Sequence, residues 1–271
     1  MFDFIADDSF EIEKTNQYKV SIQVSLDGFS FLAIHAAEKR VVAFKNTPLK
    51  ISNEKLMVRR LKEWLESEDF FKNSFNEVRV FVFTENFTII PEEYNSKETQ
   101  QDLASVLFHQ DLDFKLIENK IESLHARLYF QVQSDITEVL QHFFGNSECF
   151  HPVTQLLQIP FHSNKRNIAL VVSMKKYFYL IVRRNNKLLL ASSFLYSHQN
   201  DLVYNVLNAF QQLETARSET DLIIADVISD SNEIKSLLHP FFENISMLKT
   251  DELVVNPEII ENHLLFYLSQ N

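Results

Sequence analysis

The stretch Tyr18–Ile34, YKVSIQVSLDGFSFLAI, predicts two neighbouring strands joined by a tight turn. In its first half, apolar residues alternate with polar ones, as in a strand with one buried face. The dipeptide Asp27-Gly28 then interrupts the alternation, and Asp-Gly between strand residues is typical of a type I′ hairpin turn. The apolar run Arg40–Phe44 predicts a third strand, so we expect a three-stranded meander here.

The same pattern returns in the second half of the chain, where Asn167–Ala191 reads NIALVVSMKKYFYLIVRRNNKLLLA. These residues again predict three strands separated by short polar turns. An offset of 148 residues aligns the two copies, and it pairs Phe31 with Tyr179 and Ala43 with Ala191. The repeat indicates that the chain has two halves of the same build.

Each meander is followed by a helix and then by a short apolar strand. In the first copy, Asn53 is a suitable N-cap for the helix, and the strand is Val78–Phe83. In the second copy, Asn200 or Asp201 is the expected cap, and the strand is Leu222–Ala225. The two halves therefore agree in the order of their elements as well as in their meanders.

Three strands, a helix, a strand, a helix and a strand is the ribonuclease H-like order, and two such halves in tandem give the actin-like architecture. We therefore predict an α/β protein with the actin-like ATPase fold, in which each half has a mixed five-stranded sheet and flanking helices. The first half is residues 1–163 and carries inserted α/β elements, and the second is residues 164–271. A helix over residues 232–238 belongs to the second half.

Further elements between the two copies are predicted from periodicity and caps. In chain order they are a strand Phe87–Pro91, a helix Lys97–Leu107, strands Phe114–Ile117 and Leu128–Val132, a helix Asp135–Phe144, and a strand Val153–Ile159. Gly145 lies where a glycine at the C-terminal end of a helix belongs.

The composition excludes several classes of protein. The net charge of −11 disfavours nonspecific nucleic-acid binding, which depends on Lys and Arg neutralising phosphates. No run approaches the roughly 18 consecutive apolar residues of a membrane span, and the N-terminus does not resemble a signal peptide. The single cysteine, Cys149, excludes an intrachain disulfide and fits a reducing compartment. We expect a cytoplasmic protein that binds neither nucleic acid nor membrane.

The number of phenylalanines and the distribution of charged residues each leave two interpretations open. The 25 phenylalanines predict an aromatic-rich core, with an exposed apolar binding surface as the alternative. From Cys149 to Asn200 there is no Asp or Glu, whereas several Lys and Arg occur there. This basic stretch is either a face for an anion or an acidic partner, or a set of solvated turns.

Three segments together resemble a known family: Val20–Phe31, FTIIPEEY at Phe87–Tyr94, and the repeated meander Asn167–Ala191. Over most of its length the chain is similar to a Bacteroidetes family called domain of unknown function 3822, which has an actin-like ATPase fold. More distantly, the layout is similar to cell-division and pilus-assembly members of the actin superfamily. The closer family implies a fold but no biochemical activity.

The resemblance also implies where a nucleotide would bind, namely at the tip of the first hairpin in each half. Actin-like ATPases have there an Asp, any residue, a Gly and then Ser or Thr, which hold phosphate oxygens and a hydrated metal. Here the first tip is Asp27-Gly28-Phe29-Ser30, in which the Gly follows the Asp directly. The second tip, Ser173–Tyr177, has neither Asp nor Gly but carries Lys175 and Lys176.

The third nucleotide contact of the family is altered as well. Its adenosine-binding turn normally has a pair of glycines, and the matching stretch Ile224–Asp230 has none. The whole chain has only Gly28 and Gly145, which leaves little material for a loop that approaches a phosphate closely. We therefore expect no cofactor, with ATP and Mg²⁺ as the alternative. The vestigial cofactor-binding residues are Asp27, Gly28, Ser30, Lys175 and Lys176.

An intact fold pattern with altered tips predicts a non-catalytic protein that acts by interaction, either with a protein partner or with itself. One alternative is an ATP-binding or ATP-hydrolysing enzyme with unusual contacts in the cleft between the halves. Another is anion binding at Lys175 and Lys176.

Cys149 and His151 occupy alternating positions that would place both side chains on one face of a strand. Such a pair suits a metal site or a nucleophile with its base. Because the chain has no second cysteine, and no recognised ligand spacing surrounds the pair, we expect a structural role and no metal.

Overall fold

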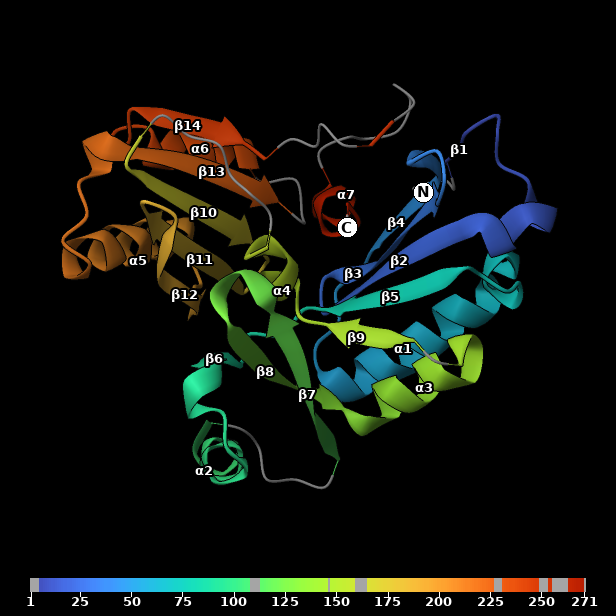
Figure 1. Ribbon diagram of the computed structural model, residues 1–271. Helices are drawn as coiled ribbons and strands as arrows, with labels where there is room; N and C mark the ends of the chain where they lie inside the picture. The colour runs from blue at the N-terminus through green and yellow to red at the C-terminus, as the bar shows by residue number, and fades with distance from the viewer. Residues whose placement is uncertain are drawn as a thin grey trace. The chain divides into compact units, whose positions relative to one another are not determined.

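Three β-sheets form the framework of the protein in a computed structural model that describes residues 5–107, 113–145, 147–158, 165–226, 231–248, 253–254 and 263–270. The chain divides into two compact units (Figure 1). The first holds Met1–Gln158, Asp251–Glu261 and Leu265–Asn271, and the second holds Ile159–Thr250 and Asn262–Leu264. The predicted boundary between residues 163 and 164 lies outside the described residues.

The main sheet of the first unit has the strand order β1-β4-β3-β2-β5-β9. Its strands are β1 (Ile5–Ala6), β2 (Tyr18–Ser25), β3 (Gly28–His35), β4 (Arg40–Pro48), β5 (Glu77–Val82) and β9 (Glu148–Phe150). β2, β3 and β4 form the predicted antiparallel meander. β5 runs parallel to β2, and β9 runs parallel to β5.

The sheet of the second unit has the order β12-β11-β10-β13-β14. Its strands are β10 (Asn167–Ser173), β11 (Tyr177–Arg184), β12 (Lys187–Leu195), β13 (Thr220–Asp226) and β14 (Asn244–Met247). Order and direction match β4-β3-β2-β5-β9 of the first unit. The predicted α/β class with two mixed five-stranded sheets is confirmed, and β1 adds a short edge strand to the first.

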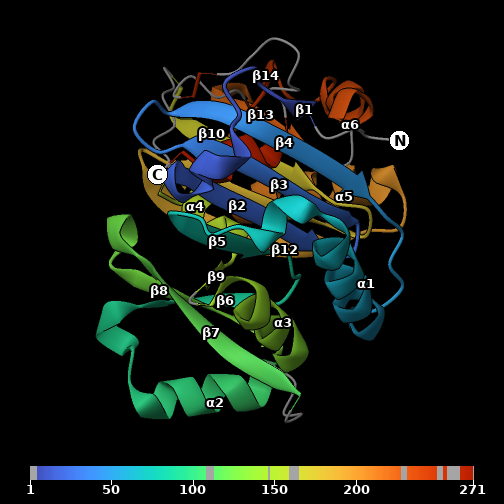
Figure 2. The ribbon, with the colours of Figure 1, turned by 90° about the vertical axis from the view of Figure 1, so that its right-hand side faces the viewer.

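Helices cover one face of each main sheet, and they are α1 (Glu54–Ser67), α3 (Ser134–Phe144), α5 (Gln199–Gln212) and α6 (Ser231–Leu238). α1 and α3 lie side by side in the first unit (Figures 1 and 2). α5 and α6 pack on the sheet of the second unit through a shared apolar cluster. α7 (Leu264–Leu268) packs on the first sheet, where the rings of Phe266 and Phe44 are 5.1 Å apart.

Short 3₁₀ helices connect these elements: η1 (Ile12–Gln17), η2 (Asp69–Lys72), η3 (Glu92–Tyr94), η4 (Glu122–Leu124) and η5 (Arg217–Glu219). Across the described ranges, every helix is too short or too polar to cross a bilayer.

The two predicted helix starts have different outcomes. The side chain of Asn53 accepts a hydrogen bond from the Leu56 amide at 2.9 Å and caps α1, as predicted. The predicted caps of α5, Asn200 and Asp201, are wrong, because His198 is the N-cap. Asp201 lies in the first turn instead, and its carboxylate accepts the His198 amide at 2.9 Å. This bond lowers the pKa of Asp201, since it stabilises the charged form.

A three-stranded antiparallel sheet, β6-β8-β7, is inserted between β5 and β9. Its elements confirm the predictions for this region: β6 (Phe87–Pro91), α2 (Lys97–Leu107), β7 (Phe114–Ile121) and β8 (Ala126–Gln133). The predicted strand Val153–Ile159 is wrong over its described part, where α4 (Pro152–Leu156) is found. Pro152 starts this helix at a position that needs no N–H donor, and His151 Nδ1 accepts the Val153 amide at 3.3 Å.

Aromatic side chains fill the core of the first unit, as the composition predicts. Phe31 stacks on Phe70 with ring centroids 4.7 Å apart, and it also contacts Trp64 and Phe71. The Trp64 indole N–H donates to Thr47 Oγ1 at 3.1 Å, so its polar atom is satisfied inside the core.

The two hairpins correspond at an offset of 149 residues, not at the predicted 148. In the first, Ser25 pairs with Gly28 across a turn of two residues. In the second, the Met174 amide donates to the Tyr177 carbonyl at 3.0 Å, again across two residues. The two turns are Leu26-Asp27 and Lys175-Lys176.

A β-bulge gives the same correspondence independently. It lies between Ala33 and Ile34 in the first unit and between Val182 and Arg183 in the second. The predicted offset is therefore wrong by one residue. Successive side chains of a strand point to opposite faces, so this slip assigns each matched side chain to the wrong face.

Candidate functional site

The first predicted phosphate tip is closed by its own hydrogen bonds. Ser25 Oγ accepts the Asp27 amide at 3.2 Å and donates to the Gly28 carbonyl at 3.0 Å. Neither Leu26 nor Asp27 has a positive φ, so the predicted type I′ turn, which requires positive φ at both central residues, is wrong. The turn is held by the serine rather than by an Asp-Gly backbone.

Gly28 has a packing role at this tip. A Cβ atom at this position would lie 2.3 Å from the Thr47 carbonyl oxygen and 2.9 Å from the Leu49 amide, and the φ of Gly28 is +135°. The Asp27 carbonyl accepts the Leu49 amide at 2.8 Å. Glycine therefore lets the tip approach the end of β4 and Leu49 more closely than a residue with a Cβ atom could.

Ser30 lies within β3, three residues beyond the turn, and is fully buried. Its hydroxyl donates to Asn46 Oδ1 at 2.8 Å on the neighbouring strand β4. The structure thus groups Asp27 and Gly28 at the tip but places the Ser30 hydroxyl inside the sheet.

The second tip presents two adjacent exposed lysines, Lys175 and Lys176. Its base is fixed by Tyr196, whose amide donates to the Lys176 carbonyl at 2.9 Å and whose hydroxyl donates to the Met174 carbonyl. Met174 itself is buried. This tip belongs to the second unit, whereas Asp27, Gly28 and Ser30 belong to the first. Of the adenosine-turn stretch 224–230, residues 227–230 lie outside the described chain.

Cys149 and His151 do not form a nucleophile and base. His151 is fully buried; its Nε2 lies 3.1 Å from the Thr84 carbonyl and its Nδ1 accepts the Val153 amide. Burial lowers the pKa of His151 to about 3, so the ring is neutral at pH 7. Burial likewise raises the pKa of the Cys149 thiol to about 11, which keeps it protonated. Within the described ranges, no three His, Cys, Asp or Glu side chains gather as a metal site would require.

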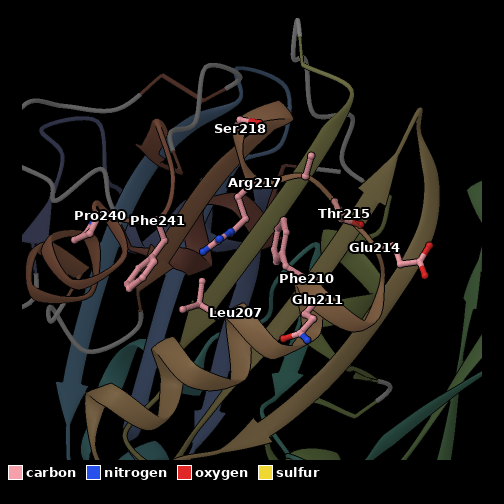
Figure 3. Close-up of a pocket in the computed structure, with 10 residues that line it drawn as sticks. Leu207, Phe210, Gln211, Glu214, Thr215, Arg217, Ser218, Pro240 and Phe241 are labelled. Atoms are coloured by element: carbon pink, nitrogen blue, oxygen red, sulfur yellow. The ribbon is translucent and has the colours of Figure 1, made fainter.

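Sequence reasoning missed a pocket of about 850 Å³ in the second unit (Figure 3). It is lined by Leu207, Phe210, Gln211, Glu214, Thr215, Ala216, Arg217, Ser218, Pro240 and Phe241. These residues come from the end of α5, the turn before β13 and the chain after α6. No local sequence pattern joins segments so far apart, so the pocket could not be read from spacing.

Comparisons with known proteins agree with the fold described above. Residues 7–245 match the model of a family described as a protein of unknown function, DUF3822, which confirms the resemblance found in the sequence. Among curated proteins, no sequence matches this chain.

Two solved structures are similar in fold. A Bacteroides thetaiotaomicron protein with an actin-like ATPase fold and unknown function aligns with a TM-score of 0.80 and 20% identity, over 88% of this chain and 93% of that one. A chain of the PilM–PilN type IV pilus biogenesis complex aligns with a TM-score of 0.60 and 9% identity, over 93% and 94%. At these identities the comparison concerns the fold, which is the actin-like ATPase fold.

Proposed function

We propose, for a chain that belongs to the DUF3822 family of proteins of unknown function, that it acts by binding a protein partner or a second copy of itself and does not hydrolyse ATP. The observation that carries this proposal is the closed first tip. The Asp27 amide is bonded to Ser25 Oγ, and the Ser30 hydroxyl is bonded to Asn46.

A phosphate-binding turn needs backbone N–H groups and a hydroxyl directed at the phosphate oxygens. The Asp27 amide and the Ser30 hydroxyl already have acceptors, so a phosphate that took these donors would leave Ser25 Oγ and Asn46 Oδ1 without them. Loss of a buried hydrogen-bond partner costs about 1 to 3 kcal/mol, which argues against nucleotide binding and turnover.

The interaction part of the proposal is supported by apolar side chains on the second unit. Leu195 at the end of β12 is 65% exposed, and Tyr204 on α5 is 67% exposed. Asn205, next to Tyr204, donates to the Leu195 carbonyl at 3.5 Å, so the two side chains come from neighbouring parts of the surface. Tyrosine is enriched at protein interfaces, and a neighbouring exposed leucine extends the apolar surface that a partner can cover. That PilM forms a complex with PilN is consistent with such a role for this fold.

The nucleotide part is tested by thermal unfolding with and without millimolar ATP and Mg²⁺. A ligand that binds the folded state raises its stability by RT ln(1 + [L]/Kd), so we expect no shift of the melting temperature. Asp27→Ala is the informative variant, and Asp113→Ala, an exposed aspartate of the same unit, is its control. Protection by ATP that Asp27→Ala abolishes and Asp113→Ala retains would replace our proposal with the ATP-binding alternative.

The interaction part is tested by sedimentation over a range of concentrations and by partner capture. We expect the double variant Leu195→Ser/Tyr204→Ser to lose an association that the wild-type chain shows. Ile12→Ser, which alters an apolar side chain 47% exposed in the first unit, is the control and keeps the association. An association equal in all three proteins would place the contact elsewhere and contradict the role of this surface.

A further inference from the structure

The pocket of the second unit combines an apolar wall with a positively charged group. Phe210 is 2% exposed and forms its base, and Leu207 and Phe241 flank it. The Arg217 guanidinium carbon lies 5.9 Å from the centroid of the Phe241 ring. Figure 3 shows Arg217 directed toward Phe241 and Leu207, whereas Glu214 points away from them.

Arg217 contrasts with Arg127 in what its guanidinium contacts. Arg127 binds the Glu92 carboxylate through two nitrogens, at 2.8 and 2.9 Å, and also contacts Glu118. Across the part of the chain that the structure describes, Arg217 makes no ion pair, and its contact is the face of Phe241. A guanidinium placed over the face of a ring at cation–π distance keeps its in-plane N–H donors available for a planar anion.

The turn that forms the pocket's rim is held in place from outside. Arg184 donates to the carbonyls of Leu213 at 3.0 Å and Glu214 at 3.1 Å, and to Thr215 Oγ1 at 2.7 Å. Lys165 donates to the Ser218 carbonyl at 2.9 Å. With both ends of the turn anchored, Arg217 is presented from a preformed loop, which lowers the entropic cost of binding.

We propose that this pocket binds a hydrophobic carboxylate. The carboxylate is held in the plane of the Arg217 guanidinium by two parallel hydrogen bonds, and an aromatic or branched apolar group lies against Leu207, Phe210 and Phe241. A volume of about 850 Å³ is within the range of sites for small molecules.

This chemistry has two sources, a free organic acid or the last residue of a polypeptide. A free acid would make the pocket a ligand site independent of the function proposed above. A C-terminal residue would make it part of the partner contact and would rest on that function.

Binding is measured by calorimetry and by shifts of the backbone amides of Leu213–Glu219 in two-dimensional NMR. The free-acid probe is 4-phenylbutyrate, with 4-phenylbutyramide as its neutral counterpart. The peptide probe is acetyl-Gly-Gly-Gly-Phe with a free C-terminus, with its C-terminal amide as counterpart. We expect each acid to bind about tenfold or more tightly than its amide, as loss of a charged hydrogen-bonded pair requires.

Arg217→Gln should weaken binding of the acids about tenfold, whereas Arg166→Gln, which removes an exposed arginine of the same unit that does not line the pocket, should not. Arg217→Lys keeps the charge but lacks the planar fork, and we expect intermediate affinity. Phe241→Ala should weaken both acids through the lost apolar wall. A tighter peptide identifies a polypeptide as the source, and equal or tighter binding of phenylbutyrate identifies a free acid. Acids that bind no better than amides, or equal losses in Arg217→Gln and Arg166→Gln, would overturn the proposal.

Discussion

The hydroxyl of Ser30 donates a hydrogen bond of 2.8 Å to Oδ1 of Asn46, directly across from it on the adjacent strand. In the pattern typical of actin-like ATPases, a hydroxyl at this place in the sequence would contact a phosphate. Here it links two strands of the first meander and has no exposed surface. In this protein the Ser30 hydroxyl is part of the sheet's internal hydrogen bonding.

Replacing Gly28 by Ala should destabilise the protein strongly. The new Cβ would meet the Thr47 carbonyl oxygen at 2.3 Å, and the φ of +135° is strained for any residue with a side chain. We expect a loss of about 3 kcal/mol in the free energy of unfolding, measured by urea denaturation. Gly145→Ala is the control for backbone strain without a clash, because its φ of +63° also disfavours alanine whereas a Cβ there meets nothing within 4 Å, and we expect it to cost less. Equal losses in the two variants would contradict the close approach at Gly28.

Replacing Phe31 by Ala should lower the free energy of unfolding of the first unit strongly. Its ring contacts Trp64, Phe70 and Phe71. Phe31→Ala would leave a cavity among them, and we expect a loss of about 3 to 5 kcal/mol in the free energy of unfolding. The fluorescence of Trp64, the only tryptophan, reports unfolding of this unit in urea. Tyr94→Ala, at a ring 62% exposed in the same unit, should cost far less. A small effect of Phe31→Ala would mean that the aromatic cluster is not close-packed.

Acid should destabilise the protein through two buried histidines. Burial lowers the pKa of His151 to about 3 and that of His263 to about 4, from an ordinary value of 6.5. Between these values and pH 6.5 the unfolded chain binds more protons than the folded one. The contribution of the two neutral histidines to the free energy of unfolding is therefore fully present above pH 6.5. It falls as the pH falls toward their folded-state pKa values, by about 1.4 kcal/mol per pH unit for each group.

This dependence is measured by urea denaturation at a series of pH values from 7.5 to 4.5. His151→Asn keeps an acceptor at the N-cap of α4 while removing the titrating ring, so we expect a shallower slope. His142→Asn, at an exposed position, is the matched control for loss of a histidine. A slope unchanged in His151→Asn would show that the ring does not titrate with unfolding.

Cys149 should react slowly with alkylating reagents in the folded protein. Burial raises the pKa of its thiol to about 11, so at pH 8 only about one molecule in a thousand carries the reactive thiolate. We expect iodoacetamide to modify the Cys149 thiol of the folded chain about a hundredfold more slowly than it modifies the thiol of glutathione. Mass spectrometry measures the extent of modification over time. The same chain in urea should react at an ordinary rate. Rapid modification without urea would contradict the burial of this thiol.

Much of the fold could be predicted because local signals agree with the tertiary structure. Asn53 caps α1 by the hydrogen bond that its position predicts, and the predicted helix Lys97–Leu107 is α2. The strand predicted over Val153–Ile159 is wrong in its described part, because a short apolar run suits a buried strand or a buried helix equally well. In the folded protein Pro152 starts the helix α4, and all five of its residues are buried.

The register of the repeat could not be obtained from alternation. β10 is buried along its whole length, and β2 is buried at all but one position, Lys19. When both faces of a strand are covered, apolar residues occur on both, and an offset of 148 matches the pattern about as well as 149. The pairing of Ser25 with Gly28 and of Met174 with Tyr177, together with the position of the β-bulge in each unit, distinguishes the two.

By itself, the order of apolar runs, caps and turn residues determined the class of fold, because these signals act between residues close in the chain. The burial of the Ser30 hydroxyl in the sheet and the existence of the pocket were decided by tertiary structure. Ser30 meets Asn46 only once β3 and β4 have paired in one register, and Arg217 meets Phe241 only after the segments that follow α5 and α6 have packed together. A side chain's chemistry depends on such neighbours, and no spacing along the chain specifies them.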